Sequence, residues 1–370
     1  MMQASFKWFV IVVSLLWLPS FSRSQVDLFE VFVKEPRLAV LPFRNLSDFP
    51  EVTPEIMAQI RAELNGLSIE LADSTVTADI LRKYRIRNTD ELTARQVQLL
   101  SEELVVGYLL VGTIDRYWQS ETSAEVALSA RLLYAPTVSI EWSSSATAHT
   151  DDHITPLGIG RIQHAEHLTR RALNRLFTDF RKHRSQRKQS VLSIQTRSKQ
   201  SSDTLLCRKL LLLTFANDTK TKFAGHIVSN QVLSALYRFG FEVVDPGRVR
   251  EVMLAKREFL RGEISSELLD EFKSELGADF VLTGTVSSYK TSLSPQNLDE
   301  PSVAFETRLV DTRNGGIVWA ETFSREGKDS AWLFHLGSVH GLGALSNRMA
   351  QNLAKAIPAV RSRKGEAKSG

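Results

Sequence analysis

Cysteine is nearly absent from this chain: Cys207 is the single one among 370 residues. The chain therefore cannot form an internal disulfide, and it cannot build a cysteine-rich zinc site. It also lacks a Gly-x-x-x-x-Gly-Lys phosphate loop, a complete Gly-x-Gly-x-x-Gly dinucleotide motif and a Gly-x-Ser-x-Gly hydrolase elbow. These absences predict a fold that depends on core packing, with no cofactor and no enzymatic activity.

Long apolar runs are also scarce. The run Trp8–Leu18 has 11 residues and follows the positive charge of Lys7. A bilayer crossing needs about 20 apolar residues, whereas a short run that ends in Pro19 and small residues is typical of a secretory signal peptide. We therefore expect a signal peptide at residues 1–24 and export to the periplasm of a Gram-negative envelope, with an uncleaved anchor as the alternative. No cysteine follows the run, so we expect no lipoprotein anchor.

Positive charge is unevenly distributed. The chain has a net charge of +4, yet the segment 181–209 holds nine basic residues against one acidic residue. This segment is also rich in Ser and Gln, which predicts a solvated basic linker. An alternative role is contact with an anionic envelope surface, such as phospholipid head groups, lipopolysaccharide or cell-wall polymer. No aromatic residues are interleaved, so we predict no nucleic-acid partner.

A segment near the start of the expected mature chain recurs 172 residues later. Leu-Ala-Val-Leu-Pro-Phe-Arg-Asn at 38–45 matches Leu-Leu-Leu-Leu-Thr-Phe-Ala-Asn at 210–217, and Leu-Val-Gly-Thr at 110–113 matches Leu-Thr-Gly-Thr at 282–285. After five extra residues in the second copy the offset becomes 177. The constant register predicts two copies of one domain. The expected boundaries are residues 36–180 for the first copy, 181–209 for the linker, 210–358 for the second copy and 359–370 for a basic tail.

Both copies show the same order of predicted elements: strand, helix, strand, helix, helix, strand, strand, strand, helix. Short apolar runs at 38–43 and 210–215 are typical of strands buried on both faces. Around Val126 the period changes to two, which predicts a half-buried strand, and the first copy ends in a helix predicted at 162–180. The order predicts the fold class α/β (α+β): two tandem mixed-sheet domains, each with helices packed in two or three layers.

Four residues between these elements carry local predictions. Gly112 and Gly284 interrupt strands, which indicates a bulge or a close approach of another group to the backbone. Asn45 and Asn217 follow strands, and each is expected to close a turn through its side chain.

Two arginine–tryptophan pairs are candidate partner contacts. Arg131 and Trp142 flank a turn in the first copy, and Arg308 and Trp319 flank the Asn-Gly-Gly turn at 314–316 in the second. Each pair is predicted to lie opposite across a hairpin, with the cation stacked on the ring. The stack either holds the hairpin together or forms an aromatic and basic surface for a partner.

Histidines gather in one part of the first copy. His149, Asp151, Asp152 and His153 are close in sequence, and His164 and His167 share one face of a predicted helix. A metal site is one interpretation. The matching positions of the second copy hold Glu326, Ser330, Gly341 and Ala344, so the fold does not need these histidines. We therefore predict solvated histidines and no metal.

Three motifs together carry a family resemblance. The first motif is the strand Leu38–Asn45 of the first copy. The other two lie in the second copy: Leu-Gly-Ala-Asp-Phe-Val-Leu-Thr-Gly-Thr at 276–285 and Arg-Leu-Val-Asp-Thr-Arg-Asn-Gly-Gly-Ile-Val-Trp at 308–319. These motifs resemble the bacterial envelope superfamily that contains the TolB amino-terminal domain, the curli-secretion (CsgG-like) proteins and the outer-membrane activators of peptidoglycan synthases. The second copy carries the fuller pattern.

The resemblance implies a non-enzymatic periplasmic scaffold or assembly factor that docks on another cell-envelope protein. Some members form rings, which leaves a homo-oligomer open. A curli-type secretion pore is not expected, because a membrane-spanning strand needs about 9–11 alternating residues and the insertion at 292–301 is short and polar. Two alternatives stay open: a small-ligand binder with a cleft between the domains, and a hydrolase that uses the histidines between His149 and His167.

Overall fold

The computed structural model describes residues 37–121, 123–152, 164–194, 209–257, 264–293, 299–330 and 339–357. The expected signal peptide, His153, residues 195–208 of the basic linker and the basic tail lie outside these ranges. The described residues belong to one compact unit that begins at Arg37. Among them, no helix combines the length and apolar character needed to span a bilayer.

The first sheet has the strand order β1-β3-β4-β5, and β2 pairs with β3 beyond the end of β1. β1 runs parallel to β3, whereas β3, β4 and β5 are antiparallel neighbours. Its strands are β1 (Leu38–Val40), β2 (Arg44–Asn45), β3 (Tyr108–Gln119), β4 (Ala124–Tyr134) and β5 (Ser139–His149). The helices of this half are η1 (Pro50–Val52), α3 (Thr53–Gly66), α4 (Ser74–Lys83), α5 (Ala94–Leu104) and α6 (Ala165–Ile194).

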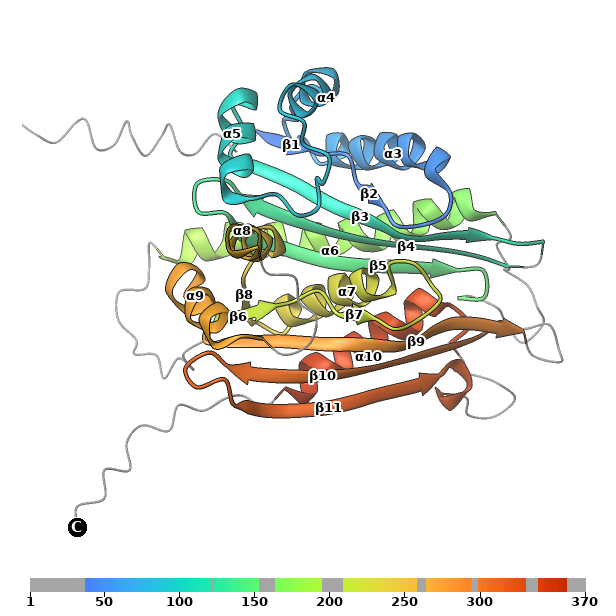
Figure 1. Ribbon diagram of the computed structural model, residues 1–370. Helices are drawn as coiled ribbons and strands as arrows, with labels where there is room; N and C mark the ends of the chain where they lie inside the picture. Colours follow the sequence, from blue (N-terminus) through green and yellow to red (C-terminus); the bar gives the residue numbers. More distant parts are fainter. Residues whose placement is uncertain are drawn as a thin grey trace, which may run out of the picture. The chain divides into compact units, whose positions relative to one another are not determined.

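The second sheet has the order β11-β10-β9-β6-β8, with β7 paired to β9 (Figure 1). Its strands are β6 (Lys209–Leu212), β7 (Ala216–Asn217), β8 (Glu242–Val243), β9 (Phe280–Leu293), β10 (Asp299–Asp311) and β11 (Ile317–Glu326). The helices are α7 (Ala224–Arg238), α8 (Pro246–Lys256), α9 (Ser266–Leu276), η2 (Gly327–Ser330) and α10 (Leu342–Ala356). Both sheets mix parallel and antiparallel strands, which confirms the predicted α+β class.

Equivalent strand pairs have equivalent registers in the two sheets. Leu38 lies opposite Tyr108, and Leu210 lies opposite Phe280. Thr113 lies opposite Ser129 in the same way as Thr285 lies opposite Glu306. The offsets of 172 and 177 residues found in the sequence therefore also relate the positions of residues within the two sheets.

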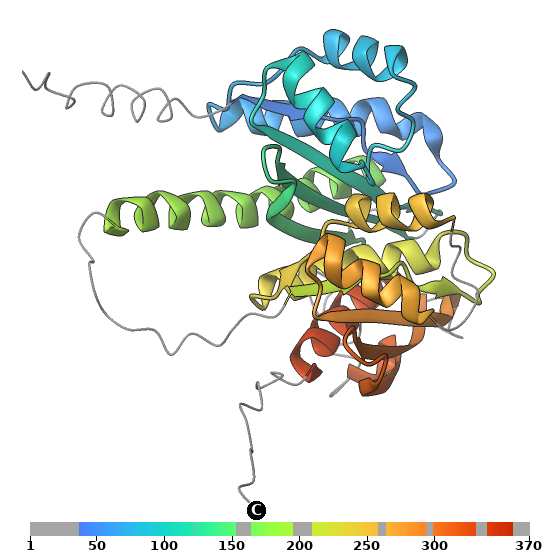
Figure 2. The same cartoon turned by 60° about the vertical axis from the view of Figure 1, so that its left-hand side comes forward.

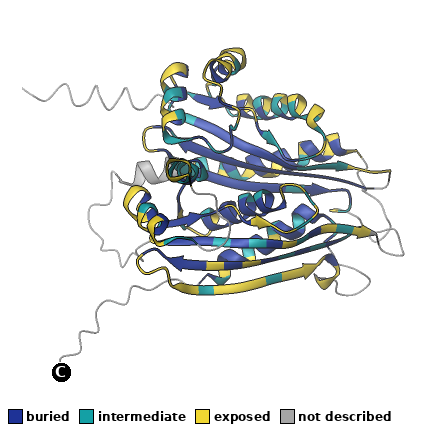
Figure 3. Ribbon diagram, viewed as in Figure 1, coloured by how far each residue is buried: buried dark blue, intermediate teal, exposed yellow. Residues whose placement is uncertain are grey.

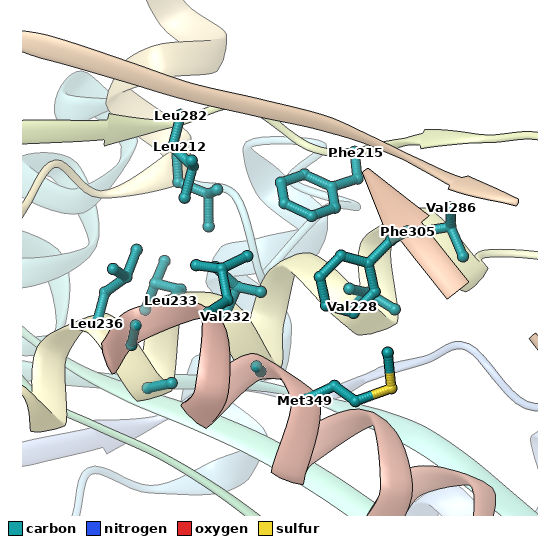
Figure 4. Close-up of a cluster of buried hydrophobic side chains, with 14 of the residues drawn as sticks. Leu212, Phe215, Val228, Val232, Leu233, Leu236, Leu282, Val286, Phe305 and Met349 are labelled. Carbon is teal, nitrogen blue, oxygen red and sulfur yellow. The ribbon is translucent and has the colours of Figure 1, made fainter. Parts of the chain in front are cut away.

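Helices α7 and α10 lie between the two sheets (Figures 1 and 2). They contact β9 and β10 of the second sheet on one side and β5 of the first sheet on the other. Their apolar side chains fill the core of the second half, where Phe215, Phe305, Val232 and Met349 come from a loop, a strand and both helices (Figure 4).

The other helices cover the remaining sheet faces. Apolar residues of α3 and α6 pack on one face of the first sheet, and those of α4 and α5 pack on its opposite face near β1. In the second half, α8 and α9 pack on the face that α7 and α10 leave free. Successive layers are thus α3 with α6, the first sheet, α7 with α10, and the second sheet.

This layering corrects the prediction of a half-buried strand around Val126. All residues of β4 from Ala124 to Leu133 are buried, because the polar side chains that alternate with the apolar ones face α7 and α10 instead of water. The equivalent strand β10 keeps the predicted alternation, with Glu306 and Arg308 exposed. Tertiary contacts, and not local pattern, decide the difference.

Helix α6 is longer than predicted. It continues from Ala165 to Ile194, well past the expected end at Phe180, and so enters the predicted linker. The stretch holds neither glycine nor proline, the residues that most strongly disfavour a helix interior. Only residues 195–208 of the linker lie outside the described ranges.

The four local predictions agree with the structure. The Asn45 side chain donates to the Phe49 carbonyl and accepts from the Ser47 amide. Asn217 makes the matching bonds with Thr221 and Thr219, so both asparagines close turns. At Gly112 a Cβ atom would lie 2.5 Å from the Phe43 ring, and at Gly284 it would lie 3.0 Å from the Phe215 ring. An aromatic ring therefore covers each strand glycine closely.

Candidate interaction surface

Among the described residues, the outer face of the second sheet is largely exposed over β10 and β11 and half-buried at Thr283 and Thr285 of β9. In Figure 3, β11 is coloured as exposed along most of its length, and it is also the edge strand of the sheet. We call this surface the open face. It is formed by Thr283, Thr285, Ser287, Ala304, Glu306, Arg308, Val318, Ala320, Thr322 and Ser324.

The chemistry of the open face suits a protein partner. Most of its side chains are small or carry a hydroxyl, and Glu306 and Arg308 add one charge of each sign. At its end near the hairpin turn, Ile317 is 57% exposed and Val318 is 45% exposed. Among the described residues, this surface offers apolar contact, hydrogen-bonding groups and an edge strand with one strand partner, the features used when proteins dock on sheets.

The equivalent face of the first sheet is buried in what we call the internal interface, its contact with α7, α10 and the start of α8. Arg131 Nε lies 3.2 Å from Asp245 Oδ2, and both side chains are almost fully buried. Arg131 also donates to the Asp90 carbonyl. Burial raises the pKa of Asp245, and the Arg131 charge offsets part of that rise. The pair is therefore an ion pair taken out of water.

Hydroxyl and amide groups complete the internal interface. The Ser143 and Ser234 hydroxyls lie 3.0 Å apart. The Asn230 amide donates to Thr113 at 3.0 Å and approaches Asp115 at 3.4 Å. Burial raises the pKa of Asp115 to about 6, although hydrogen bonds from Ser129, Thr113 and Asn230 favour its ionised form.

Glycine allows α10 to approach the first sheet closely. The Gly343 amide donates to Glu125 Oε1 at 2.7 Å, and Glu125 also pairs with Arg116 at 2.6 Å. A Cβ atom on Gly343 would lie 3.0 Å from the Ala127 side chain. The carboxylate of Glu125 is thus neutralised by a guanidinium and held by a helix N-terminus.

The predicted Arg131–Trp142 stack is wrong. Trp142 lies opposite Leu132, one position from Arg131, and Arg131 lies opposite Ser143. Neighbouring positions of a strand point to opposite faces, so Arg131 faces the internal interface and Trp142 faces α6. The ring centroids of Trp142 and Phe180 of α6 lie 5.1 Å apart. Both residues are buried within the chain and neither is presented to a partner.

The same one-residue shift separates Arg308 from Trp319. Trp319 lies opposite Leu309, and Arg308 lies opposite Ala320. Trp319 is half-buried on the inner face beside Phe323, whereas Arg308 is exposed on the open face. A partner contact by Arg308 stays a prediction, and the open face around it was missed because both copies show the same sequence alternation.

The described histidines of the cluster, His149, His164 and His167, form no metal centre. His149 is buried, its Nε2 lies 3.1 Å from the Ser123 hydroxyl, and its Nδ1 accepts from the Asp151 amide. It is therefore not the solvated histidine that we predicted. His164 and His167 stack edge to face with ring centroids 6.3 Å apart. Within the described ranges, no three His, Cys, Asp or Glu side chains are arranged to hold a metal ion.

A groove lies where the two halves meet near the turn between β4 and β5. Its volume is about 610 Å³, and it is lined by Ile140, Tyr237 and Phe241 together with the charged residues Lys209 and Arg248. This groove is the structural counterpart of the inter-domain cleft considered for a small ligand.

The comparisons with known proteins reach only part of the chain. Residues 171–326 match the family described as FlgO protein. The match begins in α6 and ends with β11, so it includes the open face and covers less than half of the chain. Most of it falls on the half that carries the fuller sequence pattern. The predicted TolB and CsgG names stay predictions. Among curated proteins, none matches the chain.

Several solved structures are similar to parts of this chain. The PelC dodecamer from Paraburkholderia phytofirmans is 21% identical over 42% of this chain and 90% of its own, with a TM-score of 0.28. Lipoprotein GNA1162 from Neisseria meningitidis is 20% identical over 40% of this chain and 99% of its own, with a TM-score of 0.29. The LpoB C-terminal domain from Salmonella enterica is 17% identical over 30% of this chain and 82% of its own, with a TM-score of 0.25.

Proposed function

We propose that this protein is a non-enzymatic scaffold or assembly factor of the periplasm that docks on other cell-envelope proteins. The observation that carries the proposal is the open face, a solvent-exposed sheet surface that ends in the edge strand β11. The signal-peptide pattern at residues 1–24 supports export. The FlgO match covers the same region of the chain.

We also infer that the two halves are copies of one unit joined in tandem. The support is the constant sequence offset together with the equal strand registers of the two sheets. The two copies use the same sheet face differently. In the first copy this face is buried in the internal interface, and in the second copy it is exposed as the open face.

Photo-crosslinking in the source cells tests the docking role. A photoreactive amino acid replaces Thr322, which is exposed at the centre of β11, and in a matched control it replaces Ser274, which is exposed on α9. We expect the Thr322 variant to give a discrete adduct whose mass spectrum identifies an exported protein. Equal adducts from both positions, or none from Thr322, would contradict the proposal.

A second candidate function is the binding of a small ligand in the 610 Å³ groove. The groove combines apolar side chains with charged ones, as ligand sites do. A thermal-shift screen against a metabolite panel tests it, because a ligand that binds the folded state raises the midpoint of unfolding. A shift that disappears in Tyr237→Ala would favour this candidate.

Contact with an anionic envelope surface is a further part of the proposal. Arg181 and Lys182, the first basic residues of the predicted linker, lie on α6. Co-sedimentation with vesicles of anionic lipid should decline as salt rises, and neutral vesicles provide the control.

A further inference from the structure

The two sheets differ in what covers the same face. The 177-residue offset relates Ser129 and Arg131 of β4 to Glu306 and Arg308 of β10. In the first sheet these positions are buried beneath α7 and α10, whereas in the second sheet they are exposed. The covering layer of the first sheet therefore indicates what kind of surface fits the open face.

Helix α3 is the counterpart of α7, and its outer side is uncovered. Along α7, eleven residues are buried, but along α3 only Ile56, Ile60 and Leu64 are. Positions 230, 234 and 238 of α7, which contact the first sheet, correspond to positions 58, 62 and 66. There α3 carries Ala58, Ala62 and Gly66, all exposed. These small residues present a flat helix surface to an incoming sheet.

Each residue of the buried Arg131–Asp245 pair has an exposed counterpart in the other half of the chain. Arg131 corresponds to Arg308, and Asp245 corresponds to Asp73, the residue that caps α4. Asp73 uses Oδ1 to accept from the Thr75 and Val76 amides. Among the described residues no hydrogen bond or ion pair engages its Oδ2, the atom that in Asp245 meets Arg131.

We propose that a second copy of this chain docks on the open face through α3 and the start of α4, so that Arg308 of one chain pairs with Asp73 of the other. This inference rests on the proposed docking function and names its partner. Because two different surfaces meet, every open assembly keeps one free surface of each kind at its ends, so association proceeds to larger assemblies or closes into a ring.

The contact between chains is less close than the internal interface. Gly247 and Gly343, which let α8 and α10 approach the first half, correspond to Thr75 and Glu166 on the docking side. Their larger side chains hold the second copy further away. We therefore expect association to depend on protein concentration.

Disulfide trapping tests the geometry. Ser143 and Ser234, whose hydroxyls lie 3.0 Å apart, correspond to Ala320 and Ala62. In the mature chain with Cys207→Ser, the double variant Ala62→Cys with Ala320→Cys should form a ladder of multimers on oxidation. The control, Ala62→Cys with Ser274→Cys, should give no ladder beyond the dimers of a single-cysteine variant. Equal patterns from the two double variants would overturn the proposal.

Charge exchange tests the pairing. Sedimentation velocity should show that Arg308→Asp and Asp73→Arg each remain monomeric at concentrations where the unmodified chain associates, and that their equimolar mixture associates again. Asp73→Asn keeps the helix cap and should weaken association, which separates loss of charge from loss of the cap. Thermal unfolding checks that each variant folds.

A mixture that stays monomeric would overturn the pairing, as would an unmodified chain that is monomeric at every concentration. The proposed docking function fails on different evidence. If the Thr322 crosslink identifies a different exported protein and the disulfide ladder is absent, docking stands and the second copy is excluded as the occupant.

Discussion

The carboxylate of Asp245 has no exposed surface, and its charge is balanced by Arg131 from the other half of the chain. Replacing Arg131 with Met keeps the length of the side chain but leaves Asp245 buried without a counter-charge. Loss of one partner of a buried pair costs about 3–5 kcal/mol. We expect Arg131→Met to lower the free energy of unfolding by this amount at pH 7, measured by urea denaturation.

The double variant Arg131→Met with Asp245→Asn provides the control. The substituted amide side chain can still accept from the Gly247 amide that Asp245 now caps at 2.8 Å, and it carries no charge to bury. The double variant should therefore be more stable than Arg131→Met alone. The opposite order would mean that the ion pair is not the source of the loss.

Asp115 makes stability depend on pH. Burial raises its folded pKa from 3.8 to about 6, so the folded state holds the proton more tightly than the unfolded state. The contribution of Asp115 to stability is then greatest below about pH 4 and falls as the pH rises to about 6. At roughly 1.4 kcal/mol per pKa unit, the loss is about 3 kcal/mol.

Asp115→Asn should remove this dependence. Relative to the unmodified chain, the variant should gain about 3 kcal/mol between pH 4 and pH 7, measured by denaturation at several pH values. Asp270→Asn, at an exposed position of α9, provides the control and should leave the pH profile unchanged. A parallel profile for Asp115→Asn would contradict the assignment.

Strand β3 depends on the absence of a side chain at one position. A Cβ atom at Gly112 would lie 2.5 Å from both the Phe43 ring and the Ser129 carbonyl. We expect Gly112→Ala to lower the free energy of unfolding by about 1–3 kcal/mol, the usual cost of overpacking. Gly66→Ala at the end of α3, where no atom lies within 4 Å, should be neutral or slightly stabilising. Equal losses from the two substitutions in urea denaturation would contradict the steric explanation.

Single elements could largely be predicted from sequence. Apolar runs and turn residues identified the strands at Leu38 and Leu210 and the Asn45 and Asn217 turns, because these features depend on neighbours in the chain. Positions that depend on distant contacts could not be predicted. Ser129 and Glu306 occupy the same place in the same alternation, yet only the first is covered.

The pairing of arginine with tryptophan failed for a related reason. Which residues face one another across a hairpin can be predicted only when the geometry of its turn is known. In this hairpin the β4–β5 register shifts between Leu132 and Leu133. One residue of shift sends Arg131 and Trp142 to opposite faces. The interaction surface therefore emerged from the layer order of the whole unit and not from a motif.

At the scale of the whole molecule, the two halves share one helical layer, and this layer should make them unfold together. α7 and α10 contribute to the core of the second half and also cover the first sheet. We expect the mature chain to unfold in one transition, with circular dichroism and tryptophan fluorescence changing at the same urea concentration.

Gly343→Leu should uncouple the halves. A Cβ atom there would lie 3.0 Å from the Ala127 side chain and 3.2 Å from the Thr147 side chain, so a leucine side chain must push α10 away from the first sheet. Asn352→Leu adds the same side chain at an exposed position of the same helix and controls for hydrophobicity. We expect two separate transitions for Gly343→Leu and one for Asn352→Leu. One coincident transition in both would mean that the halves are held together by contacts other than the approach of α10.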